Sequence, residues 1–356
     1  MLDSLPVLGV CGWSGAGKTT LLEALLPRLR RKGLRVAVAK HDAHGLDVDR
    51  QGKDSDRLFR AGADVSLAGP GQCLLRTHDD GATSLEQTCW ELARCHDLVL
   101  VEGHKGSPIP KLWLLSEGET EPPPEAAGLV AVLPRDASRP RRAARFLSSW
   151  LARQWTKPPV YACLLIGGRS SRMGSPKHLI RTDGLTWVER TVRVLEGVAS
   201  TVAIVGAGEL PPSLSDAVRL PDVADSHGPM AGLLAAMRWA PRASWLVAAC
   251  DLPDLSREAL EWLLAQRAPG RWAVLPRLPG SPGVEPLLAL YDFRAAGLLE
   301  ELAARGEHCP ARITASGRVA TPRPPKALRS AWRNVNSPEG GIACTPARKP
   351  LVSLGG

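Results

Sequence analysis

The sequence predicts an α/β protein built from two domains in succession. Its 356 residues exceed the length of one ordinary domain, which is roughly 100–200 residues. Two apolar segments, 6–12 and 159–168, have the pattern of buried strands, and each runs into a glycine-rich turn. After both turns, apolar strands alternate with amphipathic helices. This alternation is typical of largely parallel sheets with helices on both faces.

Composition excludes several classes of protein. Apolar residues make up 44% of the chain and charged residues 23%, which is ordinary for a globular protein and excludes a disordered chain. No apolar run approaches the ~18–20 residues of a membrane span. The first ten residues lack the basic and long apolar regions of a secretory signal. We therefore expect a cytoplasmic protein with no membrane partner.

The net charge of +9 raises the question of a nucleic-acid partner. The basic stretches 28–35 and 135–145 are not interleaved with aromatic residues for base stacking, so we expect an anionic small molecule instead of nucleic acid. Only ten of the 45 basic residues are lysines, which marks the lysines as candidate positions where a compact ammonium is needed. The eight cysteines have no zinc-site spacing, and we predict neither a disulfide nor a thiolate metal site.

In the first predicted domain, residues 1–150, we expect one helix over 21–29 that Pro27 kinks or ends early, and a basic helix over 138–150. Its expected strands are 6–12, 35–40, 97–103, 111–116 and 128–133. A linker is predicted over 151–158 and a second domain over 159–345. That domain has expected strands at 159–168, 201–207 and 245–251, and helices near 186–197, 231–240 and 256–267. Residues 346–356 lack periodicity and are predicted to be a disordered tail.

The first chemical signal is GWSGAGKT at residues 12–19, a full match to the phosphate-binding pattern GxxxxGK[ST]. In such a loop the backbone N–H groups surround a phosphate, the lysine reaches the β- and γ-phosphate oxygens, and the threonine hydroxyl can bind Mg²⁺. The alternative is a glycine turn that happens to precede a helix. The predicted nucleotide-binding residues are Gly12, Gly15, Ala16, Gly17, Lys18, Thr19 and Thr20. The pattern predicts a P-loop NTPase domain.

A P-loop needs an acid at the end of a neighbouring strand. Glu102 closes the apolar run 98–101, and we predict that it acts with Thr19 at a Mg²⁺ site; the alternative is an ordinary surface glutamate. The segment 39–63 is rich in Asp, His and Lys at a strand–helix junction, and it is either a γ-phosphate sensor or a polar loop. No NKxD signature for guanine is present, so this half leaves the choice of base open.

The second chemical signal is CLLIGGRSSRMGSPKHLI at residues 163–180. The turn at Gly167 and Gly168 lets the backbone approach a triphosphate, Arg172 can neutralise its β- and γ-oxygens, and Lys177 can contact the α-phosphate. Further on, Asp222 precedes a GPMAG turn, and Asp251 ends the apolar strand 245–250. An aspartate placed there can hold Mg²⁺ between α- and β-phosphates, the alternative being a helix N-cap. The predicted catalytic residues are Arg172, Lys177 and Asp251.

Residues 5–135 resemble the molybdopterin-guanine dinucleotide biosynthesis adaptor family, which consists of small P-loop GTPase-like proteins. The resemblance rests on GWSGAGKTTLL, VAKHDAH, DVDRQGKDSDRLFRAGA and LVLVEGHK, in that order. His104 stands where the family usually has an aromatic residue. The resemblance implies GTP binding with weak hydrolysis, and association with the enzyme that attaches GMP to molybdopterin.

Residues 159–345 resemble the molybdenum cofactor guanylyltransferase family through LIGGRSSRMGSPK, LPDVADSHGPMAG and WLVAACDLP. The resemblance implies a Rossmann-like nucleotidyltransferase domain that binds GTP through Leu165, Ile166, Gly167 and Lys177. It also implies that Asp222 contacts the nucleotide and that Asp251 binds Mg²⁺. Two departures are Gly206 and Gly208 where the family has an asparagine-bearing turn, and Glu285 with Pro286 where it has His-Pro.

Together the resemblances imply a fusion that transfers GMP from GTP to molybdenum-loaded molybdopterin and releases pyrophosphate. Mg²⁺ is the expected cofactor, and GTP and molybdenum-loaded molybdopterin are the expected substrates. Candidate partners are the molybdenum insertase and the apoproteins of molybdoenzymes or their chaperones. Two alternatives stay open: a cytidylyltransferase acting on the same acceptor, and a non-catalytic cofactor carrier or chaperone.

Overall fold

The computed structural model describes the chain apart from residues 1, 41–45, 80, 82, 168–175 and 336–356. It divides into two compact units, Met1–Ser149 and Trp150–Gly356. Among the described residues, no helix combines the length and apolarity that crossing a bilayer requires.

The first unit contains a five-stranded sheet in which every pair of neighbouring strands is parallel, in the order β2-β5-β1-β6-β7. Its strands are β1 (Val7–Cys11), β2 (Val36–Lys40), β5 (Leu98–Glu102), β6 (Lys111–Leu114) and β7 (Leu129–Leu133). Its helices are η1 (Leu2–Ser4), α1 (Lys18–Arg31), α2 (Asp54–Arg60), α3 (Leu85–Ala93) and α4 (Arg139–Gln154). Every residue of β1 and β5 is buried. These strands therefore read as continuous apolar runs, as expected where both faces of a sheet are covered.

The sequence predicts that Pro27 kinks helix α1 or ends it early. The helix continues past Pro27 to Arg31, so the expectation of an early end is wrong. Leu25 and Leu29 are buried on either side of the proline, whereas Pro27 itself is exposed. Burying one leucine side chain contributes about 1.5–3 kcal/mol, which is comparable to the ~3 kcal/mol cost of an interior proline. Continuing the helix is therefore favourable.

Helix α4 also differs from the prediction, because it runs to Gln154. Residues 151–154 of the predicted linker are helical. Leu147, Leu151 and Gln154 are all at most 2% exposed and recur at helical spacing. The buried stripe thus extends beyond residue 150, and this stripe, more than the basic composition, determines where the helix ends.

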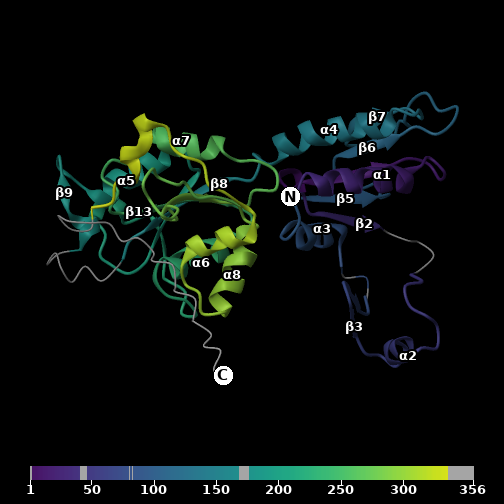
Figure 1. The fold of residues 1–356 in the computed structure, drawn as a ribbon, viewed down its shortest axis with the longest axis horizontal. Coiled ribbons are helices and arrows are strands. Elements are labelled where there is room, and N and C mark those ends of the chain that lie inside the picture. Colours follow the sequence, from purple (N-terminus) through teal and green to yellow (C-terminus); the bar gives the residue numbers. More distant parts are fainter. Residues whose placement is uncertain (1, 41–45, 80, 82, 168–175, 336–356) are drawn as a thin grey trace, which may run out of the picture. The chain divides into compact units, whose positions relative to one another are not determined.

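A separate two-stranded hairpin, β3 (Val65–Gly69) and β4 (Gln72–Arg76), lies with α2 in an arm that projects away from the five-stranded sheet (Figure 1). Asp56 is buried within this arm, where its carboxylate accepts hydrogen bonds from Gly52 N, Arg60 Nε and Arg76 Nη1. The hydrogen bond from Gly52 is the main reason that the pKa of Asp56 is lowered to about 2.

The second unit contains a seven-stranded mixed sheet in the order β12-β11-β8-β13-β15-β14-β16. Its strands are β8 (Val160–Leu165), β11 (Thr201–Val205), β12 (Val218–Leu220), β13 (Ser244–Ala249), β14 (Ala273–Val274), β15 (Leu288–Tyr291) and β16 (Val319–Ala320). Strands β12, β11, β8 and β13 are parallel, as expected, whereas β15 is antiparallel to β13 and to β14. The connection 275–287 before β15 contains no helix, and antiparallel neighbours need none.

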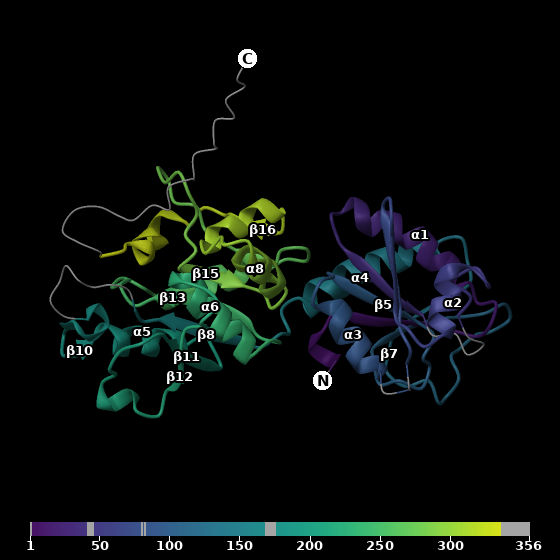
Figure 2. The ribbon, with the colours of Figure 1, turned by 90° about the horizontal axis from the view of Figure 1, so that it is seen from below.

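Helices cover both faces of this sheet. Figure 1 shows α5 and α7 on one face and α6 and α8 on the other, and Figure 2 again shows α6 beside α8. These helices are α5 (Trp187–Glu196), α6 (Gly228–Trp239), α7 (Arg257–Ala265) and α8 (Ala295–Ala304). Short elements are η2 (Lys177–Leu179), η3 (Pro212–Leu214), η4 (Pro310–Ser316), η5 (Lys326–Trp332), and the hairpin β9 (Arg181–Thr182) and β10 (Leu185–Thr186). The carboxyl ends of the four parallel strands meet at one sheet edge, where ligands commonly bind in such folds.

Candidate functional site

The first candidate site is the loop between β1 and α1. Gly12, Gly15 and Gly17 have φ of 153°, 75° and 82°, which L side chains rarely adopt. A Cβ atom at Gly12 would lie 2.6 Å from the carbonyl oxygen of Leu114. Glycine is therefore required at Gly12 for both its conformation and its close packing on β6.

The predicted side chains of this loop have defined contacts. Lys18 Nζ donates hydrogen bonds to the carbonyl oxygens of Gly12 at 3.3 Å and Trp13 at 3.0 Å. Thr19 Oγ1 donates to Glu102 Oε1 at 2.9 Å, because β1 and β5 are parallel neighbours and end at the same sheet edge. The structure thus places together the two side chains predicted to share a metal site. Ala16 is buried, and Thr20 is exposed on the first turn of α1.

Arg139, at the start of α4, belongs to this loop and sequence reasoning missed it. It is only 7% exposed, and its guanidinium donates to the carbonyl oxygens of Ala16 at 2.7 Å, Leu115 at 2.6 Å and Pro134 at 2.6 Å. Burial lowers the pKa of this guanidinium below its ordinary value. Contacts with backbone carbonyls produce no sequence motif. In the sequence, Arg139 therefore cannot be distinguished from the other arginines of 139–145.

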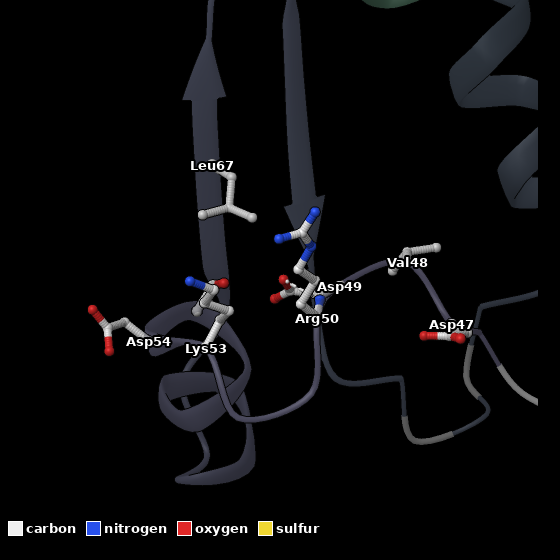
Figure 3. Close-up of a pocket in the computed structure, with 8 residues that line it drawn as sticks. Asp47, Val48, Asp49, Arg50, Lys53, Asp54 and Leu67 are labelled. Carbon is white, nitrogen blue, oxygen red and sulfur yellow. Dashed lines mark hydrogen bonds between the residues drawn. The ribbon is translucent and has the colours of Figure 1, made fainter.

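The polar segment considered as a γ-phosphate sensor falls partly outside the described residues, which exclude 41–45. Its described part lines an open pocket beside the hairpin (Figure 3). The pocket is lined by Asp47, Val48, Asp49, Arg50, Lys53, Asp54, Ser55 and Leu67. Nearby, the hydrogen-bond donors to Asp56 all come from the arm itself. The described part of the segment therefore packs against the arm and forms hydrogen bonds with it.

The second candidate site lies at the carboxyl ends of β8 and β13. Lys177 Nζ donates to Asp251 Oδ2 at 3.2 Å, although the two residues are 74 positions apart in the chain. The parallel pairing of Ala249 with Leu165 brings these two strand ends together. Ile166 is buried, and Gly167 has φ of 140°. Gly168 and Arg172, which the sequence also indicated, lie outside the described residues.

Asp251 has the donor chemistry of a metal ligand. Its side chain is buried, and in the described part of the chain its Oδ1 atom has no hydrogen-bond partner. A buried carboxylate oxygen without a donor is costly unless something occupies it. Carboxylate oxygens are what Mg²⁺ binds, typically one or two from the protein with phosphates and water completing the shell. Asp251 therefore fits the ion that the sequence predicts there.

Asp222, just after β12, lies close to the end of β8. A Cβ atom at Gly232 of α6 would lie 2.5 Å from Leu165 Cδ2 and 3.2 Å from Asp222 Oδ1. The second glycine of the GPMAG turn therefore lets α6 approach both residues. Desolvation by this packing raises the pKa of Asp222 above its ordinary value, although the residue reaches solvent.

The glycines that replace the family's asparagine-bearing turn have a structural reason. A Cβ atom at Gly206 would lie 1.9 Å from the carbonyl oxygen of Ile166, and one at Gly208 would lie 2.8 Å from His178 Cε1. A side chain at 206 would collide with backbone, and one at 208 would have to displace the His178 ring. Burial raises the pKa of Glu285, which stands at the other departure.

Neither candidate site resembles a closed protein metal centre. Across the residues that the structure describes, no group of three or more His, Cys, Asp and Glu side chains is placed to hold a metal ion. Instead, the first site presents a hydroxyl beside a carboxylate, and the second a single carboxylate. Such sparse protein ligation is typical of an ion that shares its coordination with phosphates and water.

The two units therefore define two classes of domain. A glycine loop with Lys18, Thr19 and an adjacent strand-end acid defines a P-loop NTPase domain. The edge of the second sheet, with Lys177 and Asp251, defines a nucleotidyltransferase domain. Comparison with known proteins agrees: the chain belongs to two families, molybdopterin guanine dinucleotide synthesis protein B over residues 7–134 and the MobA-like NTP transferase domain over 162–319. The two family resemblances and the fold class predicted from the sequence are confirmed.

Individual relatives cover one unit each. The molybdopterin-guanine dinucleotide biosynthesis adapter protein of Haemophilus influenzae is 38% identical over 42% of this chain and 92% of its own length. A probable molybdenum cofactor guanylyltransferase of Bacillus mycoides is 32% identical over 37% of this chain and 67% of its own length. The crystal structure of molybdopterin-guanine dinucleotide biosynthesis protein A from Archaeoglobus fulgidus is 26% identical, with a TM-score of 0.43, covering 50% of this chain and 93% of that one.

Proposed function

We propose that the second unit transfers GMP from GTP to the terminal phosphate of molybdenum-loaded molybdopterin, forming the guanine dinucleotide cofactor and pyrophosphate. The observation that carries the proposal is the contact of Lys177 Nζ with Asp251 Oδ2, while Oδ1 of the same carboxylate has no hydrogen-bond partner among the residues that the structure describes. The membership of residues 162–319 in an NTP transferase family and their similarity to a probable guanylyltransferase support the substrate class.

The chain's own residues supply alignment and positive charge. An acceptor phosphate oxygen attacks the α-phosphorus of GTP, and the bond to the β-phosphate oxygen breaks to release pyrophosphate. The acceptor is already an anion, so no general base is needed. Lys177 would exchange its hydrogen bond with Asp251 for one with an α-phosphate oxygen. Arg172 would neutralise the charge of the β- and γ-phosphate oxygens. The turn at Gly167 would let the backbone approach the triphosphate. Asp222 would contact the nucleotide.

The fitting ligand for Mg²⁺ in this unit is Asp251. When bound, the ion would neutralise negative charge shared by the α- and β-phosphates. In the first unit, Thr19 and Glu102 offer a hydroxyl and a carboxylate for a second ion. In both places the protein supplies few ligands, which leaves the remaining positions for phosphate oxygens and water.

For the first unit, residues 1–150 in our assignment, we propose a GTP-binding adaptor with weak hydrolysis that serves the transferase domain at 159–345. The observation that favours it is the hydrogen bond from Thr19 to Glu102 beside the glycine loop. Joining an adaptor and its transferase in one chain replaces a bimolecular encounter with a high effective concentration. Molybdenum insertase and molybdoenzyme apoproteins or their chaperones are the proposed further partners.

The test is turnover of the full chain with GTP, CTP or ATP and molybdenum-loaded molybdopterin. Pyrophosphate release and the mass of the dinucleotide product are both measured. We expect a guanine dinucleotide from GTP and little product from the other nucleotides. A cytosine dinucleotide would replace the proposal with a cytidylyltransferase. Absence of any product, with the cofactor still bound, would favour a carrier or chaperone.

A further inference from the structure

Trp13, in the glycine loop of the first unit, is held on several sides. Its ring meets the ring of buried Trp113 edge-on, with centroids 6.0 Å apart. The ammonium of Lys105 lies over the Trp13 ring, 3.7 Å from its centroid, and Trp13 remains 45% exposed. Burial alone would raise the pKa of Glu119, but hydrogen bonds from Ser116, Trp113 and Trp13 outweigh it and lower that pKa. The indole therefore forms a fixed platform on which Lys105 rests.

Positive charge gathers at this end of β1. Lys18 donates to the carbonyl oxygen of Trp13, the same residue whose ring carries Lys105. Burial raises the pKa of the Cys11 thiol, and the ammonium groups of Lys111, Lys18 and Lys105 oppose this increase in part. The described partners of Lys18 are carbonyl oxygens, and those of Lys105 are the indole rings of Trp13 and, at 5.8 Å, Trp113. These are weak partners for a full charge compared with phosphate oxygens.

The backbone that carries Lys105 is fixed in an unusual conformation. Gly103 and His104 connect Glu102 to Lys105, and their φ angles are 91° and 56°. Lys111 is fully buried in β6, and its ammonium donates to the carbonyl oxygens of Lys105, at 2.8 Å, and of Ser107. Left-handed backbone at a non-glycine residue such as His104 is unfavourable and clusters at functional sites. The turn 103–107 thus holds Lys105 close behind the predicted metal-binding acid.

We propose that Lys105 is a second phosphate-binding lysine of this loop, which rests on Trp13 in the absence of nucleotide and binds the terminal phosphate of a nucleoside triphosphate. This rests on the proposed nucleotide binding by the P-loop. A cation–π contact at an exposed ring is weaker than a charge-assisted hydrogen bond to a phosphate oxygen. Exchanging the ring for a phosphate oxygen is therefore favourable, and Lys105 distinguishes triphosphates from diphosphates.

The composition of the chain agrees with this role. Only ten of its 45 basic residues are lysines, and three of the ten are Lys18, Lys105 and Lys111. Arginine already serves as the buried cation of the loop at Arg139. A lysine at 105 supplies a compact charge on a flexible stem, which suits a group that moves between two partners.

The experiment measures dissociation constants of the full chain for GDP and for the non-hydrolysable analogue guanosine 5′-(β,γ-imido)triphosphate, both with Mg²⁺. The variants are Lys105→Gln and Lys105→Arg, with Lys32→Gln as the matched control, since Lys32 is an exposed lysine of the same unit that bonds Ser148. Binding to the first unit is defined as the part lost in Lys18→Ala. We expect Lys105→Gln to weaken the triphosphate about tenfold or more and GDP less than about twofold, with partial recovery in Lys105→Arg.

The outcomes separate the two proposals. If Lys18→Ala binds both nucleotides like the natural chain, the P-loop proposal itself fails. If Lys18→Ala loses a site but Lys105→Gln changes GDP and triphosphate equally, Lys105 only packs on Trp13 and the inference is overturned. A second readout is the fluorescence difference between the natural chain and Trp13→Phe. It should change on adding the triphosphate analogue and not GDP, and an equal response to both contradicts the inference.

Discussion

At the scale of single residues, Asp251 combines two roles that a substitution can separate. One oxygen accepts from Lys177, and the other has no hydrogen-bond partner in the described residues. Asp251→Asn keeps the shape and the acceptor for Lys177 but removes the charge. We expect transfer to fall below about a tenth of the natural rate, equivalent to about 1.4 kcal/mol of barrier, with little change in melting temperature.

The control is Asp254→Asn, which removes a nearby carboxylate that pairs with Arg333. Its turnover should stay close to that of the natural chain. Pyrophosphate release under saturating GTP measures both variants. Retention of more than about a tenth of the rate by Asp251→Asn would contradict the assignment of Asp251 as the metal ligand.

Lys177 should not tolerate arginine. Its ammonium sits 3.2 Å from Asp251 with 17% of the side chain exposed. A planar guanidinium would form two hydrogen bonds with this carboxylate or with the ground-state triphosphate. Stronger binding of the ground state does not raise turnover. We expect Lys177→Arg to lose nearly as much kcat as Lys177→Ala. Lys326 is an exposed lysine of the same unit, and Lys326→Arg should leave kcat unchanged. Natural turnover in Lys177→Arg would make Lys177 a generic positive charge.

At the scale of elements, the arm of α2, β3 and β4 depends on one carboxylate. The pKa of Asp56 is about 2 in the folded arm against an ordinary 3.8. The folded arm therefore binds protons less readily than the unfolded arm, and its stabilisation is present above pH 3.8 and lost as the pH falls toward 2. Amide hydrogen exchange in the arm should accelerate over this range while exchange in β1 does not.

Asp56→Asn should remove this pH dependence and expose the arm to exchange at neutral pH. Asp54→Asn is the matched control, because its side chain is 97% exposed. An arm whose exchange follows the same pH profile in Asp56→Asn would show that another group titrates there.

The Arg139 side chain joins helix α4 to the glycine loop. Arg139 supplies donors to three backbone carbonyls, and a charged hydrogen bond contributes about 1.5–3 kcal/mol. Arg139→Met should lower the free energy of unfolding of the first unit by about 3 kcal/mol or more, measured by urea denaturation. Arg142→Met, on the same helix but 54% exposed, should change it by less than about 1 kcal/mol. Equal effects of the two would contradict an anchoring role.

At the scale of the whole molecule, each unit has its own loop, cation and acid. Lys18 and Glu102 lie at the candidate site of the first unit, and Lys177 and Asp251 at that of the second. Lys18→Ala should therefore remove nucleotide binding and hydrolysis by the first unit while transferase turnover in vitro stays largely intact. Measurement of GTP hydrolysis and of dinucleotide formation on one preparation tests this. A parallel loss of both would show that the chain has one shared site.

Residues that repeat a local pattern could be predicted, and residues fixed by packing could not. The spacing of Gly12, Gly17 and Lys18 predicts a phosphate-binding loop from the sequence alone. Parallel strands explain why Lys177 and Asp251 meet across 74 positions. Arg139 donates to carbonyl oxygens, and such contacts leave no spacing to detect. Lys105 ends the motif LVLVEGHK, but its contact with an indole ring is visible only in the structure. Similarly, α4 passes its predicted end because a buried stripe continues through Leu151 and Gln154.

The pair formed by Lys177 and Asp251 affects the order in which ligands arrive. While it is intact, each group serves as the counter-ion of the other, so a lone divalent ion meets a carboxylate whose charge is already compensated. A metal–nucleotide complex brings a phosphate for the lysine and a cation for the aspartate at once, and the exchange conserves charge. We therefore expect the resting site to favour the complex over either component, with saturation that follows the concentration of the complex alone.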